Sequence, residues 1–98
     1  MSGSADIHYR SFSAPYLYWA SWNDEYVVFD EASGQTHQLD AVRAYVLHLV
    51  SDRPQTVSEV VQALSELPTL PKDSVTSAVV SVILGEFETS GLAEALTP

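Results

Sequence analysis

The most constraining feature of this chain is a short extended run that passes directly into an amphipathic helix between Ser33 and Val50. Gln35–Leu39 has the composition of a half-exposed strand, and Asp40 places a side-chain oxygen where a helix needs an N-cap. Five apolar residues then recur at helical spacing and share one helix face: Val42, Tyr45, Val46, Leu49 and Val50. The sequence therefore predicts a strand joined to a helix through a single capping residue.

Two further strands are predicted before this junction. The aromatic-rich run Tyr16–Trp22 and the run Glu25–Asp30 are separated by Asn23 and Asp24, which tolerate a tight turn. A second turn over Glu31–Gly34 returns the chain as a third antiparallel strand. That third strand is an edge unless the C-terminus covers it, and an edge strand offers unpaired N–H and C=O groups to which another extended chain can add.

The rest of the chain is predicted to be mainly helical. The first helix is expected over Ala41–Asp52, and the capping box Thr56-Val57-Ser58-Glu59 predicts the start of a second, short helix. Prolines in the segment 67–71 predict a linker after it. The core stripe of the second helix is expected to be Val57, Val60, Val61 and Leu64.

A third helix is expected to be capped by Asp73 or Ser74 and to end near Ser90, with Gly91 after it and a short extended tail over 91–96. Its apolar residues cover an arc of roughly 240°, although a surface helix needs only a little over 100°. They are Val75, Ala78, Val79, Val80, Val82, Ile83, Leu84 and Phe87. The surplus face fits a peptide groove, burial between other elements of the chain, or a homodimer interface.

Composition excludes several classes of function. Ninety-eight residues suit one small domain, expected over residues 15–96 after a flexible segment 1–14. Thirteen acidic and four basic residues give a formal charge of −9, which repels nucleic acid and anionic lipid and favours a partner with basic groups. The chain has no cysteine, no signal-peptide pattern and no apolar run near the ~18–20 residues of a membrane span. A cytoplasmic location is expected.

No residue pattern predicts catalysis, a metal or a cofactor. His8, His37 and His48 share no spacing typical of a zinc site, and Asp24–Glu25 and Asp30–Glu31 are expected to be solvated turn acids. Nucleophile and phosphate-loop motifs are absent. His37 stands out because it lies in the middle of the predicted edge strand, where a solvated role and a ligand contact are both reasonable.

A DNA-binding winged helix is the alternative to a peptide-binding domain. Such proteins also combine a small sheet with three helices, but their recognition helix carries Arg, Lys, Asn or Gln to the groove. Between Asp73 and Ser90 the chain has no basic residue. This alternative, together with a winged-helix module for protein interaction, is therefore the weaker hypothesis.

Several short segments between Leu17 and Leu92 carry a family resemblance. They are Trp19-x-x-Trp22, Tyr26–Asp30, Ser33-Gly34-x-Thr36-His37-x-Leu39-Asp40, Thr56-Val57-x-Glu59-Val60 and Ser90-Gly91-Leu92. In these segments the chain resembles the PqqD-like family, the recognition elements that bind leader peptides of ribosomally made, modified peptides. It looks most like the PqqD-type proteins of the HPr-rel-A systems.

The resemblance implies an α+β, winged-helix-like fold with a three-stranded antiparallel sheet packed on three helices and no catalytic activity. It also implies that a leader peptide adds beside the third strand, enters a groove against the third helix, and is presented to a separate peptide-modifying enzyme. The implied site residues are Gln35, Thr36, His37, Gln38, Val79, Val80, Ile83, Leu84 and Phe87. The Thr36-His37 pair departs from the usual form of members that handle the pyrroloquinoline-quinone precursor, so that cofactor is not predicted.

Overall fold

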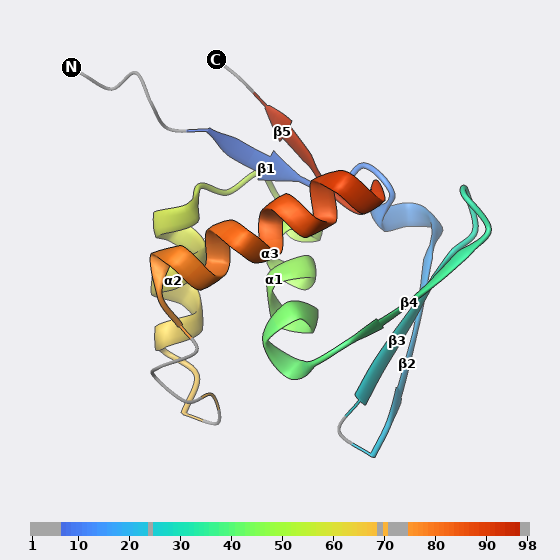
Figure 1. Cartoon of the computed structure of the whole chain (residues 1–98), viewed down its shortest axis with the longest axis horizontal. Helices are drawn as coiled ribbons and strands as arrows, with labels where there is room; N and C mark the ends of the chain where they lie inside the picture. Colours follow the sequence, from blue (N-terminus) through green and yellow to red (C-terminus); the bar gives the residue numbers. More distant parts are fainter. Residues whose placement is uncertain (1–6, 24, 69, 71–74, 97–98) are drawn as a thin grey trace.

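A computed structural model of the chain describes residues 7–23, 25–68, 70 and 75–96. In this part, two small antiparallel sheets accompany three helices (Figure 1). The elements are β1 His8–Arg10, a 3₁₀ turn Ala14–Tyr16, β2 Leu17–Trp22, β3 Glu25–Asp30, β4 Gln35–Leu39, α1 Ala41–Asp52, α2 Val57–Ser65, α3 Ser77–Ser90 and β5 Glu94–Leu96. The predicted α+β, winged-helix-like fold is confirmed.

The larger sheet is an antiparallel meander in the order β2-β3-β4. Its strands match the predicted runs, except that β2 begins one residue later, at Leu17. Asn23 has a positive φ of 52°, as its place in the β2–β3 turn requires, while Asp24 lies outside the described residues. The alternation of side chains along these strands directs Val28 and Leu39 toward the helices, where both are buried.

The β3–β4 turn is held by Asp30, which is buried rather than solvated as the sequence had suggested. Its carboxylate accepts hydrogen bonds from the Ala32 main-chain N–H and the Ser33 hydroxyl, both at 3.0 Å. Gly34 has a φ of 76° and donates its N–H to the Asp30 carbonyl. These hydrogen bonds offset the cost of removing the Asp30 carboxylate from water.

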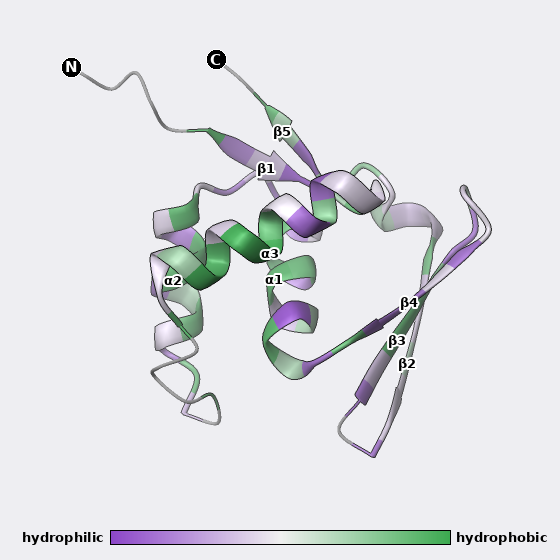
Figure 2. Cartoon of the chain, viewed as in Figure 1, coloured by the Kyte–Doolittle hydropathy of each residue, from purple (hydrophilic) through white to green (hydrophobic). Residues whose placement is uncertain are grey.

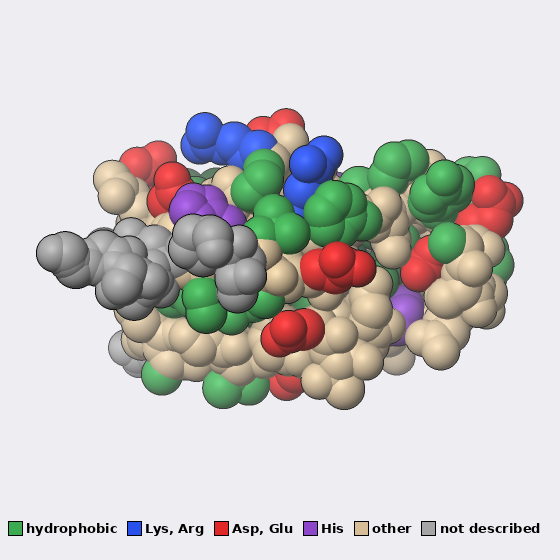
Figure 3. All heavy atoms as spheres, turned by 90° about the horizontal axis from the view of Figure 1, so that it is seen from above, with side chains coloured by type: hydrophobic (Ala, Val, Ile, Leu, Met, Phe, Trp, Pro, Cys, Tyr) green, Lys and Arg blue, Asp and Glu red, His purple; other side chains and the backbone are tan. Residues whose placement is uncertain are grey.

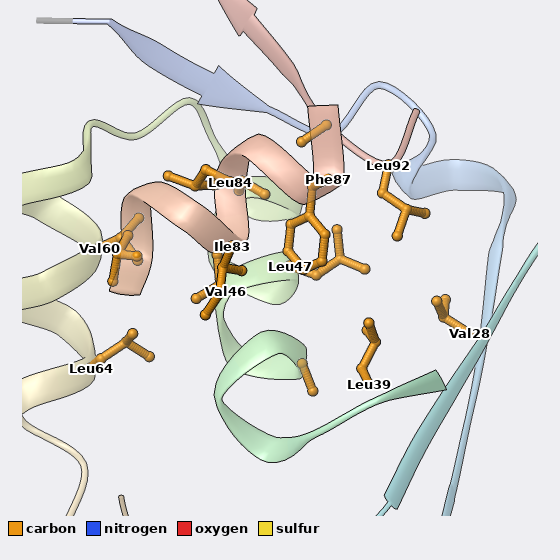
Figure 4. Close-up of a cluster of buried hydrophobic side chains, with 14 of the residues drawn as sticks. Val28, Leu39, Val46, Leu47, Val60, Leu64, Ile83, Leu84, Phe87 and Leu92 are labelled. Carbon is orange, nitrogen blue, oxygen red and sulfur yellow. The ribbon is translucent and has the colours of Figure 1, made fainter. Parts of the chain in front are cut away.

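The predicted junction between β4 and α1 is confirmed. The Asp40 carboxylate accepts the main-chain N–H of Arg43 at 2.8 Å, which is the N-cap bond of α1. The helix is buried on more sides than its predicted stripe, because Ala44 and Leu47 are buried beside Val46 and Val50. Figure 4 shows Leu47 between the sheet residues and α3, so α1 is the central element of the core.

The other two helices also begin at capping residues. Thr56 and Glu59 form the predicted capping box of α2. The start of α3 differs from the prediction: Thr76 is the N-cap, and its hydroxyl accepts the Val79 N–H at 3.2 Å. Asp73 and Ser74 lie outside the described residues. The helix ends as predicted, with Gly91 in the left-handed region at φ 83°.

The N-terminal segment is paired with the rest of the fold from His8 onward. β1 pairs with β5, and Tyr9 also exchanges main-chain hydrogen bonds with Gln55 at 2.8 and 3.0 Å. Ser11 donates its N–H to the Val50 carbonyl at 2.9 Å. The flexible segment expected over residues 1–14 therefore does not include His8–Arg10, because these residues close a two-stranded sheet over the helices.

An ion-pair cluster joins α1 to α3. The Arg43 guanidinium contacts Glu86 through two nitrogens, at 2.8 and 3.0 Å, and contacts Asp40 through the third at 2.8 Å. The hydrogen bond from Arg43 holds the pKa of the Glu86 carboxyl below its ordinary value. This cluster fixes the distance between the first turn of α1 and the middle of α3, on a partly exposed surface.

Within the described residues, none of the helices has the length and apolar character needed to cross a membrane. Figure 2 places hydrophobic residues along the first half of α3 and over much of α1, the two helices that meet at the centre of the fold. Their hydrophobic surfaces are thus accounted for mainly by contacts within the chain.

Leu84 and Val82 form a matched pair on α3 for testing this packing. Leu84 is fully buried, whereas Val82 is 59% exposed. Replacing Leu84 with Ala should lower the free energy of unfolding by about 2–5 kcal/mol, because a core side chain leaves a cavity. Val82→Ala should change it by no more than about 0.5 kcal/mol. Urea unfolding of both variants measures the difference, and equal losses would contradict the burial pattern.

The ion-pair cluster predicts a specific acid dependence. Because the pKa of Glu86 is lowered in the fold, its contribution to stability is present above its ordinary pKa of 4.5 and is lost as the pH falls through the lowered value. In Arg43→Gln the Glu86 pKa should return toward 4.5, as measured by the pH dependence of its carboxyl ¹³C shift. Arg53→Gln, on a distant arginine, is the control and should leave the Glu86 pKa in place.

Candidate functional site

The outer edge of β4 is open. β4 pairs with β3 on one side, and no strand among the described residues pairs with it on the other. Of the four strand residues predicted to bind peptide, Gln35, Thr36 and Gln38 are exposed and His37 is half-buried. This edge therefore keeps a row of main-chain donors and acceptors available for another extended chain.

His37 differs from its neighbours because its side chain lies on the helix side of the sheet. It is paired in register with Val28, which is fully buried. The His37 Nε2 atom is buried and has no hydrogen-bond partner among the described residues. His37 thus belongs partly to the core face, whereas Thr36 and Gln38 belong to the solvent face of the sheet.

The predicted helix wall is largely occupied by the chain's own core. Val80, Ile83, Leu84 and Phe87 are no more than 2% exposed and pack against α1, α2 and the sheet (Figure 4). These four side chains were expected to form a free groove wall, but they are buried in the core. Of the five predicted wall residues, only Val79 is half-exposed. The apolar residues of α3 that remain accessible are Ala78, Val79 and Val82, which lie on the side of the helix next to the buried wall residues.

That surplus face borders an open pocket of about 320 Å³. We call it the α3 pocket, and it is lined by Arg43, Ala78, Val79, Val82 and Ile83. Ala78 and Val82 belong to the apolar arc of the sequence, but nothing in the sequence distinguished them from the arc residues that are buried. Arg43 could not be recognised from periodicity, because it is a polar residue in the first turn of another helix.

The α3 pocket begins where β4 ends. Arg43, which lines the pocket, follows the last β4 residue by four positions, and its guanidinium is held by Asp40 and Glu86. Hydrogen bonding to Glu86 is the main reason why the Arg43 pKa is raised, so this side chain stays charged. Two carboxylates share one guanidinium here, so the ion-pair cluster that includes the pocket residue Arg43 carries a net negative charge.

The arrangement offers a strand edge and an apolar pocket to which another chain can bind. In the described part of the chain, no group of three or more His, Cys, Asp or Glu side chains is placed to hold a metal ion. A second cavity of about 320 Å³ lies between the end of α1 and α2, and two of its polar residues already bond within the fold: Glu59 closes the α2 capping box and Gln55 bonds to the Leu49 carbonyl. The open strand edge and the α3 pocket are not used by contacts of the fold itself.

Comparison with known proteins agrees with this description. Over residues 25–92, more than half of the chain, the sequence matches the family described as Coenzyme PQQ synthesis protein D (PqqD). No protein of curated function matches the chain significantly.

Two solved structures share the fold. One is TbiB1 in complex with the TbiA(beta) leader peptide, which is 20% identical, covers 91% of this chain and 99% of its own, and has a TM-score of 0.64. The other is lasso peptide synthetase B1 complexed with the leader peptide, with 19% identity, coverage of 91% and 98%, and a TM-score of 0.58. The family resemblance carried by the sequence motifs is confirmed, and the chain belongs to the PqqD family.

Proposed function

We propose that this protein binds the leader segment of a precursor peptide by strand addition to β4 and presents it to a separate modifying enzyme, without catalysing a reaction itself. The observation that carries the proposal is the open edge of β4 beside the apolar α3 pocket. It is supported by the two similar structures, both of which are complexes with leader peptides.

Main-chain hydrogen bonds would provide the sequence-independent part of the affinity. Along a five-residue strand such as β4, alternate residues direct their N–H and C=O groups to the outer edge. Each bond contributes about 0.5–1.5 kcal/mol net, and ordering a flexible peptide offsets much of that sum. The edge alone therefore gives weak binding, and a second contact is needed for a stable complex.

The α3 pocket would supply that second contact and the selectivity. Successive side chains of an added strand point to opposite faces of the sheet, so every second one faces the helix side, as His37 does in β4. At the end of the strand such a side chain meets Val79 and Val82. An apolar leader residue is therefore favoured at this position, because it removes the exposed Val82 from water.

Charge narrows the class of peptide further. The net negative charge of the cluster formed by Arg43, Asp40 and Glu86 favours a leader residue that is neutral or basic next to the apolar anchor. Three of the five N–H donors of Arg43 already bond to Asp40 and Glu86, so its charge is balanced by two carboxylates and attracts an acidic leader residue only weakly.

Strand addition predicts a change in amide exchange in β4. In the free protein, the amides of Gln35–Leu39 that face the outer edge should exchange rapidly, while those bonded to β3 are protected. Titration with synthetic leader segments of candidate precursor peptides should protect the outward amides and shift the resonances of Val79 and Val82. Shifts confined to the α1–α2 cavity would contradict the proposed site.

The pocket can be tested without disturbing the core. Val82→Asp should weaken leader binding by about tenfold or more, equivalent to about 1.4 kcal/mol, because it places a charge where an apolar side chain must be desolvated. Ser65→Asp adds the same charge on an exposed residue of α2 and should leave the affinity unchanged. Calorimetric titration measures both. Equal affinities for the two variants would remove the α3 pocket from the proposal.

A further inference from the structure

The solvent face of the β2-β3-β4 sheet is apolar at its centre. Side chains alternate along each strand, and the strand register places Tyr18 beside Phe29, Ala20 beside Val27, and Trp22 beside Glu25. On β4 the same face carries only Thr36 and Gln38. We call the five apolar positions the outer sheet face: Tyr18, Ala20, Trp22, Val27 and Phe29.

This face exposes large aromatic side chains that the fold does not use. Trp22 is 76% exposed, Tyr18 59% and Phe29 38%, and the Tyr18 and Phe29 rings lie 6.5 Å apart. Aromatic side chains are enriched in the centres of protein interfaces, where they bury a large area at a small entropic cost. Three of them on one face of a sheet form a surface suited to another folded protein.

The charges around this face select the kind of partner. Between Ser11 and Val42 the chain contains no Lys or Arg, and two of its acidic residues, Glu25 and Glu31, are exposed beside this face. Glu25 and Glu31 lie at opposite ends of β3, and the Tyr18 hydroxyl donates to Glu31 at 3.5 Å. Figure 3 shows hydrophobic side chains beside acidic ones at the sheet end of the molecule, with Lys and Arg farther along. The outer sheet face thus has an apolar centre and an acidic border.

A second copy of this chain is a poor match for that border. In a symmetric dimer the acidic residues would oppose their own copies without any basic residue from the sheet to pair with. The same border repels nucleic acid and anionic membrane surfaces. Charge complementarity therefore requires a protein whose apolar patch is bordered by Lys and Arg.

We propose that the outer sheet face is the docking surface for such a protein, and that this partner is the enzyme that acts on the bound peptide. The second part rests on the proposed leader binding. A peptide strand added beside β4 would extend the sheet, so every second peptide side chain would lie next to Thr36 and Gln38 on the same face. A protein docked there would contact both this chain and the bound peptide.

The first experiment identifies the occupant. The photo-crosslinking amino acid p-benzoylphenylalanine replaces Ala20 in the full chain, expressed in its source cell, and the adduct is identified by mass spectrometry. The same replacement at Ser65 on α2 is the control. The expected result is an adduct with a second protein from position 20 alone. No adduct, or only an adduct between two copies of this chain, would overturn the proposal.

The second experiment measures binding to that identified protein after purification. Trp22→Ser should weaken the complex by about tenfold or more. The double variant Glu25→Lys with Glu31→Lys should slow association and reduce its dependence on salt, whereas Glu66→Lys on the α2 side should not. Unchanged affinity in Trp22→Ser, with the variant folded by circular dichroism, would overturn the docking surface.

Leader binding is measured separately, so that the two proposals can fail independently. Trp22→Ser should bind the leader peptide as the original chain does, and Val82→Asp should bind the partner protein as the original chain does. Partner binding that depends on Trp22 in the absence of any leader affinity would retain the docking surface and reject the peptide site. If Trp22→Ser lost affinity for both the leader peptide and the partner protein, the outer sheet face would not be a separate surface, and the docking proposal would be overturned.

Discussion

The position of the open strand relative to α3 depends on one carboxylate, Asp40. It caps α1 through the Arg43 N–H and also holds the Arg43 guanidinium, which reaches Glu86 on α3. A cap of this kind contributes about 0.5–2 kcal/mol, and the partly exposed ion pairs contribute less. Their importance is geometric, because Asp40 and Arg43 lie three positions apart at the β4–α1 junction and Arg43 reaches Glu86 on α3, 43 positions further along the chain. The end of β4, the start of α1 and the middle of α3 are thereby set in a fixed relation, and the α3 pocket lies within it.

One helix serves both the core and the pocket. Leu84 and Phe87 belong to the buried core, while Val79 and Val82 line the pocket. Ile83 contributes to both and is 1% exposed. The pocket floor is therefore built on side chains whose rotamers are fixed by core packing, which reduces the entropy lost when a ligand binds. The wide apolar arc of α3 is explained by this double use.

Local signals in the sequence predicted most of the elements, whereas long-range contacts decided the rest. Alternation and caps were sufficient for β3, β4, α1 and α2, and Gly91 marked the end of α3. The β1–β5 sheet was missed because three-residue strands from opposite ends of the chain have no local pattern. The buried face of α3 could not be chosen, because an apolar arc wider than half a turn leaves the rotation of the helix undetermined until α1 and α2 are in place. Asp30 was misjudged for the same reason: its burial depends on how the turn folds back over it.

The open edge of β4 also explains why recognition must involve more than the main chain. Unpaired strand edges promote aggregation, and β4 limits that tendency by being five residues long and by presenting Gln35, Thr36 and Gln38 to solvent. The acidic residues around the sheet oppose pairing between copies of the chain. A short, polar strand edge of this kind discriminates against arbitrary extended peptides, because main-chain hydrogen bonds alone bind them too weakly. In the proposed function, a peptide that also places an apolar side chain against Val79 and Val82 gains the additional affinity that it needs, and selectivity would arise from coupling a permissive edge to one specific pocket.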